Sequence, residues 1–169
     1  RGIVVHWVAG NITTLSFFSL FQSLICKNSN ILKIKSKHSK IFLLILEKLK
    51  SIKINYKGNE YLGEVLYLNT AFVVFSHSAN ELSTELSKCA DFRIIWGGED
   101  AVNGILALPQ REHCETAIFG PKYSFAVIDS ESLALSGSKY IRNLGIDLFT
   151  FDQSACTSPH VLFIEASEG

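Results

Sequence analysis

Several patterns that mark metal-binding, disulfide-rich and membrane-spanning proteins are missing from this sequence. The four cysteines show no C-x-x-C spacing, the five histidines show no H-E-x-x-H spacing, and no G-x-G-x-x-G fingerprint occurs. These gaps argue against a zinc site, a disulfide framework and the usual dinucleotide-binding motif. The longest apolar stretch, residues 15–26, contains Ser and Gln and is too short to cross a bilayer. We therefore expect a reduced cytoplasmic protein with up to three buried thiols, no metal and no membrane span.

An excess of charge of one sign is also absent. The sequence has 16 basic and 16 acidic residues among 169, so its overall charge gives no reason to expect nucleic acid or a membrane surface as a partner. Lysines nevertheless gather between residues 27 and 57. The length suits one domain. Because the chain starts without Met and directly on an apolar run, we expect residues 1–169 to be a single domain of a longer protein.

Apolar runs of strand length alternate with segments of helical spacing. Strands are expected at residues 3–8, 30–34, 71–75, 91–96, 117–119, 124–128 and 161–164, and helices at 15–26, 39–52, 78–89, 99–108 and 130–144. Residues 53–62 are polar and suit a loop or short hairpin, and Ser78, with Glu81 three residues on, is expected to cap a helix. The alternation predicts an α/β, doubly wound, mostly parallel sheet with helices on both faces.

Ligands of such sheets bind beyond the carboxyl ends of the strands, so the turns there are the places to search. Gly10 and Asn11 follow the first expected strand. They form either a simple turn or a place where the Asn amide donates to a developing negative oxygen. Gly97 and Gly98 lie between a strand and a helix, where glycine allows a close backbone approach and the helix N-terminus favours anions. A lone glycine pair is weak support for a ligand site.

The turn after the second expected strand is basic. Lys33, Lys35 and Lys37 surround Ser36, and the turn contains no acid. It is either a solvated basic loop or a cradle for ribose and phosphate, because a doubly wound sheet commonly binds the adenosine ribose at this strand end. An acid there would favour a free 2′-hydroxyl, whereas cations favour a 2′-phosphate.

Cys156 is the candidate nucleophile. It stands between Gln-Ser-Ala and Thr-Ser-Pro-His, just before the last apolar run, whereas a structural cysteine usually sits inside an apolar run. The thiolate is the reactive form of cysteine, and such a setting is where a thiolate would be used. His160 lies four residues further on, either as a surface or packing histidine or as the partner in a Cys–His pair.

Five segments, read in order, carry a family resemblance. They are residues 3–11 (IVVHWVAGN), 27–33 (KNSNILK), 96–99 (WGGE), 119–124 (FGPKYS) and 151–156 (FDQSAC). Together they resemble the nucleotide-binding half of the aldehyde dehydrogenase superfamily, and more closely the long-chain acyl-CoA reductase family of bacterial bioluminescence (lux) systems. The resemblance implies that residues 1–169 form a nucleotide-binding domain that ends just past the catalytic cysteine.

The resemblance also implies a reaction. Cys156 would attack a fatty acyl-CoA thioester, with Asn11 and the backbone N–H of Cys156 as the oxyanion hole, and a nicotinamide cofactor would then give a fatty aldehyde by hydride transfer. Ile118 stands where hydrolytic aldehyde dehydrogenases carry a glutamate that activates water. Because Ile cannot act as a base, the acyl-enzyme would be spared from hydrolysis.

The cofactor residues follow from the same resemblance. Lys33 matches the lysine that holds the adenosine ribose, and Ser36 stands where NAD-preferring members carry an acid. Gly97 and Gly98 match the segment near the nicotinamide and pyrophosphate. NADPH is therefore favoured, with NADH as the alternative.

The resemblance leaves other functions open. One is a nucleotide-binding or assembly module without activity of its own, and another is a related CoA-acylating aldehyde dehydrogenase. An acyl-transferring partner protein and a homo-oligomer of the full-length protein are also expected.

Overall fold

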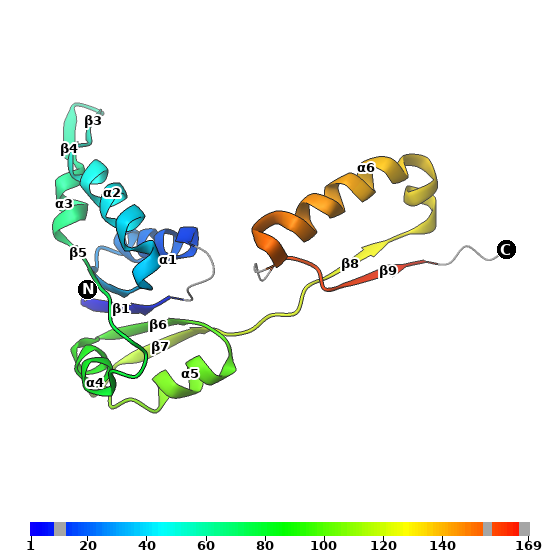
Figure 1. The fold of residues 1–169 in the computed structure, drawn as a ribbon. Helices are drawn as coiled ribbons and strands as arrows, with labels where there is room; N and C mark the ends of the chain where they lie inside the picture. The colour runs from blue at the N-terminus through cyan, green and yellow to red at the C-terminus, as the bar shows by residue number, and fades with distance from the viewer. Residues whose placement is uncertain (9–12, 154–156, 166–169) are drawn as a thin grey trace. The chain divides into compact units, whose positions relative to one another are not determined.

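The computed structural model describes residues 1–8, 13–153 and 157–165 and divides the chain into two compact units, Arg1–Gly120 and Pro121–Gly169 (Figure 1). The assignment of residues 1–169 to one nucleotide-binding domain stays a prediction. No helix among the described residues is long and apolar enough to cross a membrane.

The first unit is built on a five-stranded parallel sheet with the strand order β5-β2-β1-β6-β7. The strands are β1 (Ile3–Trp7), β2 (Ser29–Lys33), β5 (Thr70–Val73), β6 (Phe92–Trp96) and β7 (Glu115–Phe119). The helices between them are α1 (Thr13–Ile25), α2 (Ser39–Lys50), α4 (Asn80–Cys89) and α5 (Glu99–Leu106). This arrangement confirms the predicted α/β fold, since every strand of the sheet is parallel and helices alternate with strands.

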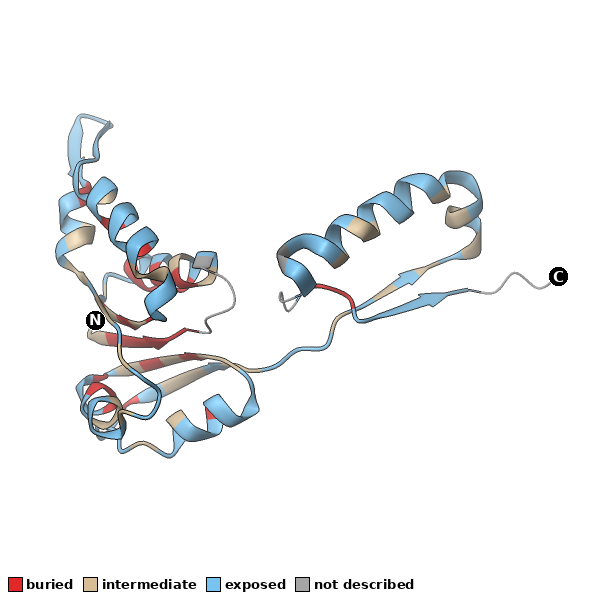
Figure 2. Ribbon diagram, viewed as in Figure 1, coloured by how far each residue is buried: buried red, intermediate tan, exposed pale blue. Residues whose placement is uncertain are grey.

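The sheet is covered on both faces, with α1 and α2 on one side and α4 and α5 on the other (Figure 1). Val5 and Trp7 of β1 pack with Leu86 of α4, whereas Val8, the residue after β1, points to the other face and joins a second cluster with residues of α1 and α2. Figure 2 shows the buried residues gathered along the strands and the inner sides of these helices. Strands buried on both faces read as continuous apolar runs, which explains why they are visible in the sequence.

Two local expectations meet different outcomes, and one helix was not expected at all. Residues 53–62 form the antiparallel hairpin of β3 (Lys53–Tyr56) and β4 (Asn59–Leu62), one of the two predicted alternatives. The capping role predicted for Ser78 is wrong, because α4 begins at Asn80 and the Ser78 hydroxyl pairs with that of Ser76 at 2.8 Å. The short helix α3 (Gly63–Leu68) was not predicted.

The described cysteines differ in burial, within the expectation of up to three buried thiols. Cys26 and Cys89 are exposed, and Cys114 alone is buried among the three thiols that the structure describes. Burial is the main cause that raises the pKa of the Cys114 thiol, so it is unsuited to act as a nucleophile.

The second unit pairs β8 (Phe125–Ile128) with β9 (Val161–Ile164) in parallel, joined through α6 (Ser130–Phe149) and the short 3₁₀ helix η2 (Thr150–Gln153). The Asp129 carboxylate caps α6 by accepting from the backbone N–H of Ser132 at 2.7 Å. Every residue of β9 is exposed (Figure 2).

Candidate active site

The strand order places a switch point between β1 and β6. The chain passes from β1 outward to β2 and β5, and then returns to the other side of β1 to form β6 and β7. Ligands of doubly wound sheets bind beyond the carboxyl ends of the strands at such a switch point. The sequence predicted Gly10, Asn11, Gly97 and Gly98 for the loops that follow β1 and β6. Gly10 and Asn11 lie outside the described residues.

Gly97 and Gly98 link β6 to α5. The Gly97 N–H donates to the Phe119 carbonyl at 3.3 Å, and the Gly98 carbonyl accepts from the Val102 N–H at 3.0 Å to start the helix. A Cβ placed on Gly98 would meet no atom within 4 Å, whereas one on Gly97 would lie 3.1 Å from the Cβ of Ala101. The backbone at Gly98 is thus open to close approach by a ligand.

The charges at this turn restrict what it suits. Glu99 and Asp100 occupy the first turn of α5, where their carboxylates already interact with the positive end of the helix dipole. A pyrophosphate placed there would be repelled by both carboxylates. The Gly98 backbone therefore suits an uncharged ring or amide better than a phosphate.

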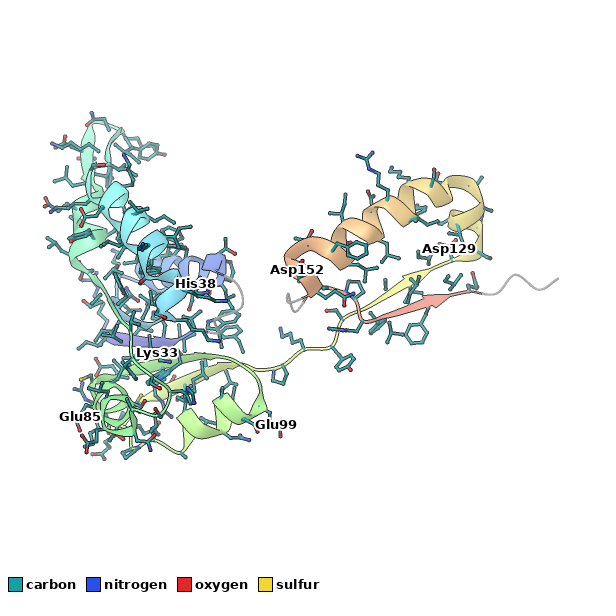
Figure 3. All side chains as sticks on the ribbon, in the orientation of Figure 1. Lys33, His38, Glu85, Glu99, Asp129 and Asp152 are labelled. Atoms are coloured by element: carbon teal, nitrogen blue, oxygen red, sulfur yellow. The ribbon has the colours of Figure 1, made fainter. Side chains whose placement is uncertain are left out.

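Lys33 is the last residue of β2 and lies beside Trp7 in the register of the sheet. Its Nζ stands 5.5 Å from the centre of the Phe75 ring, a cation–π distance. Burial, followed by the charge of Lys35, lowers the pKa of Lys33. Lys33, at the carboxyl end of β2, and Glu99, three residues after β6, are labelled in Figure 3 and belong to the same carboxyl edge of one sheet.

Ser36, three residues after Lys33, opens the 3₁₀ helix η1 (Ser36–His38). Its side chain is exposed, and its carbonyl accepts from the Ser39 hydroxyl at 2.7 Å. Lys35 and Lys37 on either side are exposed as well. The end of β2 is therefore a basic surface, which suits an anionic group such as a phosphate.

A buried polar network lies between α1 and the sheet, and the sequence did not reveal it. The Trp96 Nε1–H donates to the Ser19 hydroxyl at 3.1 Å, and Ser19 pairs with His6 Nδ1 at 2.7 Å. His6 Nε2 pairs with Asn30 Oδ1 at 3.0 Å, and the Asn30 amide donates to the Asn28 carbonyl at 2.9 Å. His6, Ser19 and Asn30 are all buried.

The partners decide how the protons are placed. Asn30 Oδ1 can only accept, so His6 carries its proton on Nε2 and Nδ1 accepts from Ser19. Burial lowers the pKa of His6 to about 4, although its bond to Asn30 acts in the opposite direction. His6 is therefore neutral at pH 7 and orients its neighbours rather than acting as an acid or base.

A cavity of about 450 Å³ lies at the opposite, amino edge of the sheet. Its lining includes Ile3, Val4, Ser23, Asn28 and Phe92. None of the predicted site residues that the structure describes lines it, and the carboxyl edge carries the glycine turn and the basic surface. We therefore assign the candidate site to the carboxyl edge. The described residues hold no group of three or more His, Cys, Asp or Glu side chains suited to a metal ion.

Comparison with known proteins identifies the family. The family model for acyl-CoA reductase (LuxC) matches residues 1–169.

The chain belongs to the acyl-CoA reductase (LuxC) family.

Its curated relatives are distant and longer. A long-chain acyl-protein thioester reductase 2 from Photobacterium leiognathi is 24% identical over 164 residues, which cover 96% of this chain and 32% of the relative. A long-chain acyl-protein thioester reductase from Photorhabdus luminescens is 24% identical over 167 residues, 99% of this chain and 32% of the relative. This LuxC-family chain thus spans about a third of the length of these relatives.

The proposed nucleophile and its surroundings are described only in part. Cys156 lies outside the described residues, as does Asn11. Ile118 lies on β7 beside Ile95 and is 49% exposed. Its aliphatic side chain offers no group that could take a proton from water.

The segment after Cys156 belongs to the second unit. The His160 N–H donates to the Ser124 carbonyl at 2.9 Å, and its ring centre lies 5.5 Å from that of Tyr123. Ser158 is 1% exposed, and its hydroxyl has no hydrogen-bond partner among the described residues. A Cys–His pair between Cys156 and His160 stays a prediction.

Proposed function

We propose that the protein reduces long-chain fatty acyl thioesters to fatty aldehydes with NADPH, through an acyl group bound to Cys156. The match of the LuxC family model to all 169 residues carries this proposal. The switch point of the sheet supports it, because a doubly wound sheet binds its cofactor there.

The chemistry assigned to the cysteine is acyl transfer. The Cys156 thiolate attacks the thioester carbonyl carbon, the bond to the coenzyme A sulfur breaks, and the released thiolate takes up a proton. The Asn11 amide and the Cys156 N–H stabilise the negative oxygen that forms during attack. Bound NADPH supplies the hydride that reduces the acyl carbon. The carbon–sulfur bond to Cys156 then breaks, which releases the aldehyde and restores the thiolate.

The residues at the carboxyl edge fit the cofactor. Lys33, Lys35 and Lys37 provide positive charge at the end of β2, and Ser36 places no carboxylate there to repel a 2′-phosphate. The open backbone at Gly98 accepts the uncharged nicotinamide end, whereas Glu99 and Asp100 disfavour the pyrophosphate at that turn. These features favour NADPH over NADH.

Ile118 makes reduction rather than hydrolysis the outcome. A general base within reach of a water molecule would hydrolyse the acyl-enzyme to a fatty acid. Ile118 cannot serve as that base, so the acyl group persists until hydride arrives. A CoA-acylating aldehyde dehydrogenase is the related alternative, since it uses the same acyl-enzyme in the reverse direction.

The acyl donor and the assembly are part of the proposal. The relatives' names specify acyl-protein thioesters as their substrates. We propose that a partner protein delivers the acyl group to this protein as well, with acyl-CoA as an alternative donor, and that the full-length protein is a homo-oligomer.

Labelling tests the acyl-enzyme. The intact protein is incubated with a radiolabelled long-chain acyl-CoA in the absence of NADPH, and bound label is counted after denaturation. Wild type is expected to retain the label and Cys156→Ala to lose it. Cys89→Ala removes an exposed thiol elsewhere and should label like wild type. Equal labelling of wild type and Cys156→Ala would overturn the assignment.

The second candidate is a nucleotide-binding or assembly module without activity of its own. The observation in its favour is that the chain spans about a third of the relatives' length. Calorimetry with NADPH and with NADH separates the candidates when combined with the labelling. Binding without acylation supports the module, and binding with acylation supports the reductase.

A further inference from the structure

The indole of Trp96 is held from two sides at the carboxyl end of β6. Its Nε1–H donates to Ser19 of α1 at 3.1 Å. Its ring stacks on Phe119, the last residue of β7, with ring centres 3.9 Å apart and planes 8° from parallel. A helix and a neighbouring strand therefore fix this side chain together.

Ser19 is itself oriented by the buried network. Because its oxygen accepts from Trp96, its hydroxyl hydrogen is directed to His6 Nδ1 at 2.7 Å, and His6 is held in turn by Asn30. Ser19 and His6 are both 0% exposed. Water does not compete for these bonds, so removing one partner leaves the other unsatisfied.

The backbone that leaves Trp96 forms the glycine turn at the switch point. Gly97 donates to the Phe119 carbonyl, so both the indole and the next peptide are anchored to the last residue of β7. We propose that Ser19 is a positioning residue of the cofactor site: its hydroxyl holds the Trp96 indole and thereby sets the Gly97–Gly98 backbone against which the cofactor lies. This inference rests on the proposed function, since it assumes that NADPH binds at this edge.

Helix α1 supplies its own control. Ser16, Ser19 and Ser23 lie on one buried side of the helix at spacings of three and four residues. Ser23 lines the cavity at the amino edge, and its hydroxyl accepts from the Asn28 side chain at 3.5 Å. Ser23→Ala thus removes a buried hydroxyl from the same helix without touching Trp96.

The test is a double-mutant cycle on NADPH affinity, measured by calorimetry on the intact protein. Ser19→Ala and Trp96→Phe are each expected to weaken NADPH binding about tenfold. The double variant should resemble either single variant, because both changes break one interaction. Ser23→Ala should bind NADPH like wild type. Acylation from acyl-CoA, which needs no NADPH, should change less than about twofold in all of them.

An indole NMR signal and the melting temperature distinguish a positioning role of Ser19 from an effect on stability alone. Residues 1–169 contain two tryptophans, Trp7 and Trp96, and each gives one indole signal in a nitrogen-15 NMR spectrum. Ser19→Ala should shift the signal that Trp96→Phe removes. Unchanged NADPH affinity in Ser19→Ala, with only a lower melting temperature, would overturn the proposal. So would independent, multiplicative effects of the two substitutions.

The remaining outcomes are also decisive. If Ser19→Ala does not fold, Trp96→Phe alone decides, and unchanged NADPH affinity in it overturns the proposal. If wild type itself binds no NADPH, the proposed function fails and this inference fails with it. If wild type and Ser19→Ala bind NADPH equally well, the inference about Ser19 fails while the proposed function stands.

Discussion

The guanidinium of Arg93 on β6 donates to the hydroxyl of Thr116, the residue beside it on β7, at 3.0 Å. The same side chain donates to the Ser87 hydroxyl at 3.2 Å and to the Ile105 carbonyl at 3.3 Å. Arg93 is 2% exposed. One buried cation thus joins α4, α5 and β7 under one face of the sheet.

Arg93→Met is expected to lower the free energy of unfolding by about 3 kcal/mol. The substitution keeps most of the aliphatic stem but leaves the hydroxyls of Ser87 and Thr116 without their donor. Urea unfolding followed by circular dichroism measures the change. Arg142→Met, at an exposed position of α6, should change it by less than about 0.5 kcal/mol. Equal stability of the two variants would contradict this role for Arg93.

Stability should fall as the pH drops from about 6.5 to about 4. The pKa of His6 is lowered from 6.5 to about 4 by burial, so over this range the unfolded chain binds a proton that the folded chain does not. The His6 contribution is complete above pH 6.5 and amounts to about 3 kcal/mol. Urea unfolding at each pH measures it.

Two variants isolate the His6 share of this pH dependence. His6→Gln is expected to be less stable than wild type at pH 7, yet to show a shallower loss of stability between pH 6.5 and 4. His113→Gln, whose wild-type side chain is 90% exposed, should keep the wild-type slope. An unchanged slope in His6→Gln would show that other groups cause the loss.

The two glycines of the turn should respond differently to alanine. Gly98→Ala is expected to change the free energy of unfolding by less than about 1 kcal/mol, because φ −70° and ψ 172° suit any residue and no atom lies within 4 Å of the new Cβ. Its NADPH affinity should fall about tenfold if the cofactor lies against this backbone.

Gly97→Ala provides the comparison. Its Cβ would lie 3.1 Å from that of Ala101, so it is expected to cost about 1 kcal/mol of stability. Calorimetry with NADPH and urea unfolding are run on both variants. Wild-type NADPH affinity in Gly98→Ala would remove this turn from the cofactor site.

Ser36→Glu should shift the cofactor preference toward NADH by about tenfold or more. The added carboxylate repels a 2′-phosphate and offers acceptors to a free 2′-hydroxyl. The ratio of the dissociation constants for NADPH and NADH is the measurement. Ser51→Glu adds the same charge at the far end of α2 and should leave the ratio as in wild type. A Ser36→Glu variant with the wild-type ratio would place the 2′-phosphate elsewhere.

The sheet could be predicted from the sequence because its central strands bury side chains on both faces. Short apolar runs surround Val5, Ile31 and Ile95, and each expected strand of the sheet overlaps the observed one. Helix α3 was not predicted because it has only six residues and begins at a glycine, Gly63. Gly63 packs so closely on the Leu49 carbonyl that no side chain would fit there.

The buried network could not be predicted, since nothing in a sequence says which polar residues meet. His6 interrupts an apolar strand, Asn30 lies near the start of another, and Ser19 looks like a helix residue of neutral character. The only signal was that each stands where an apolar side chain is usual. The roles of Cys156 and Asn11 stay predictions, because both residues lie outside the described ranges.

The two tryptophans of residues 1–169, Trp7 and Trp96, end the neighbouring strands β1 and β6. Tryptophan fluorescence from these residues therefore comes only from the two strands on either side of the switch point. Residues 121–169 contribute no indole emission. The tryptophan fluorescence of residues 1–169 is thus an optical probe of one edge of one sheet, without any added label.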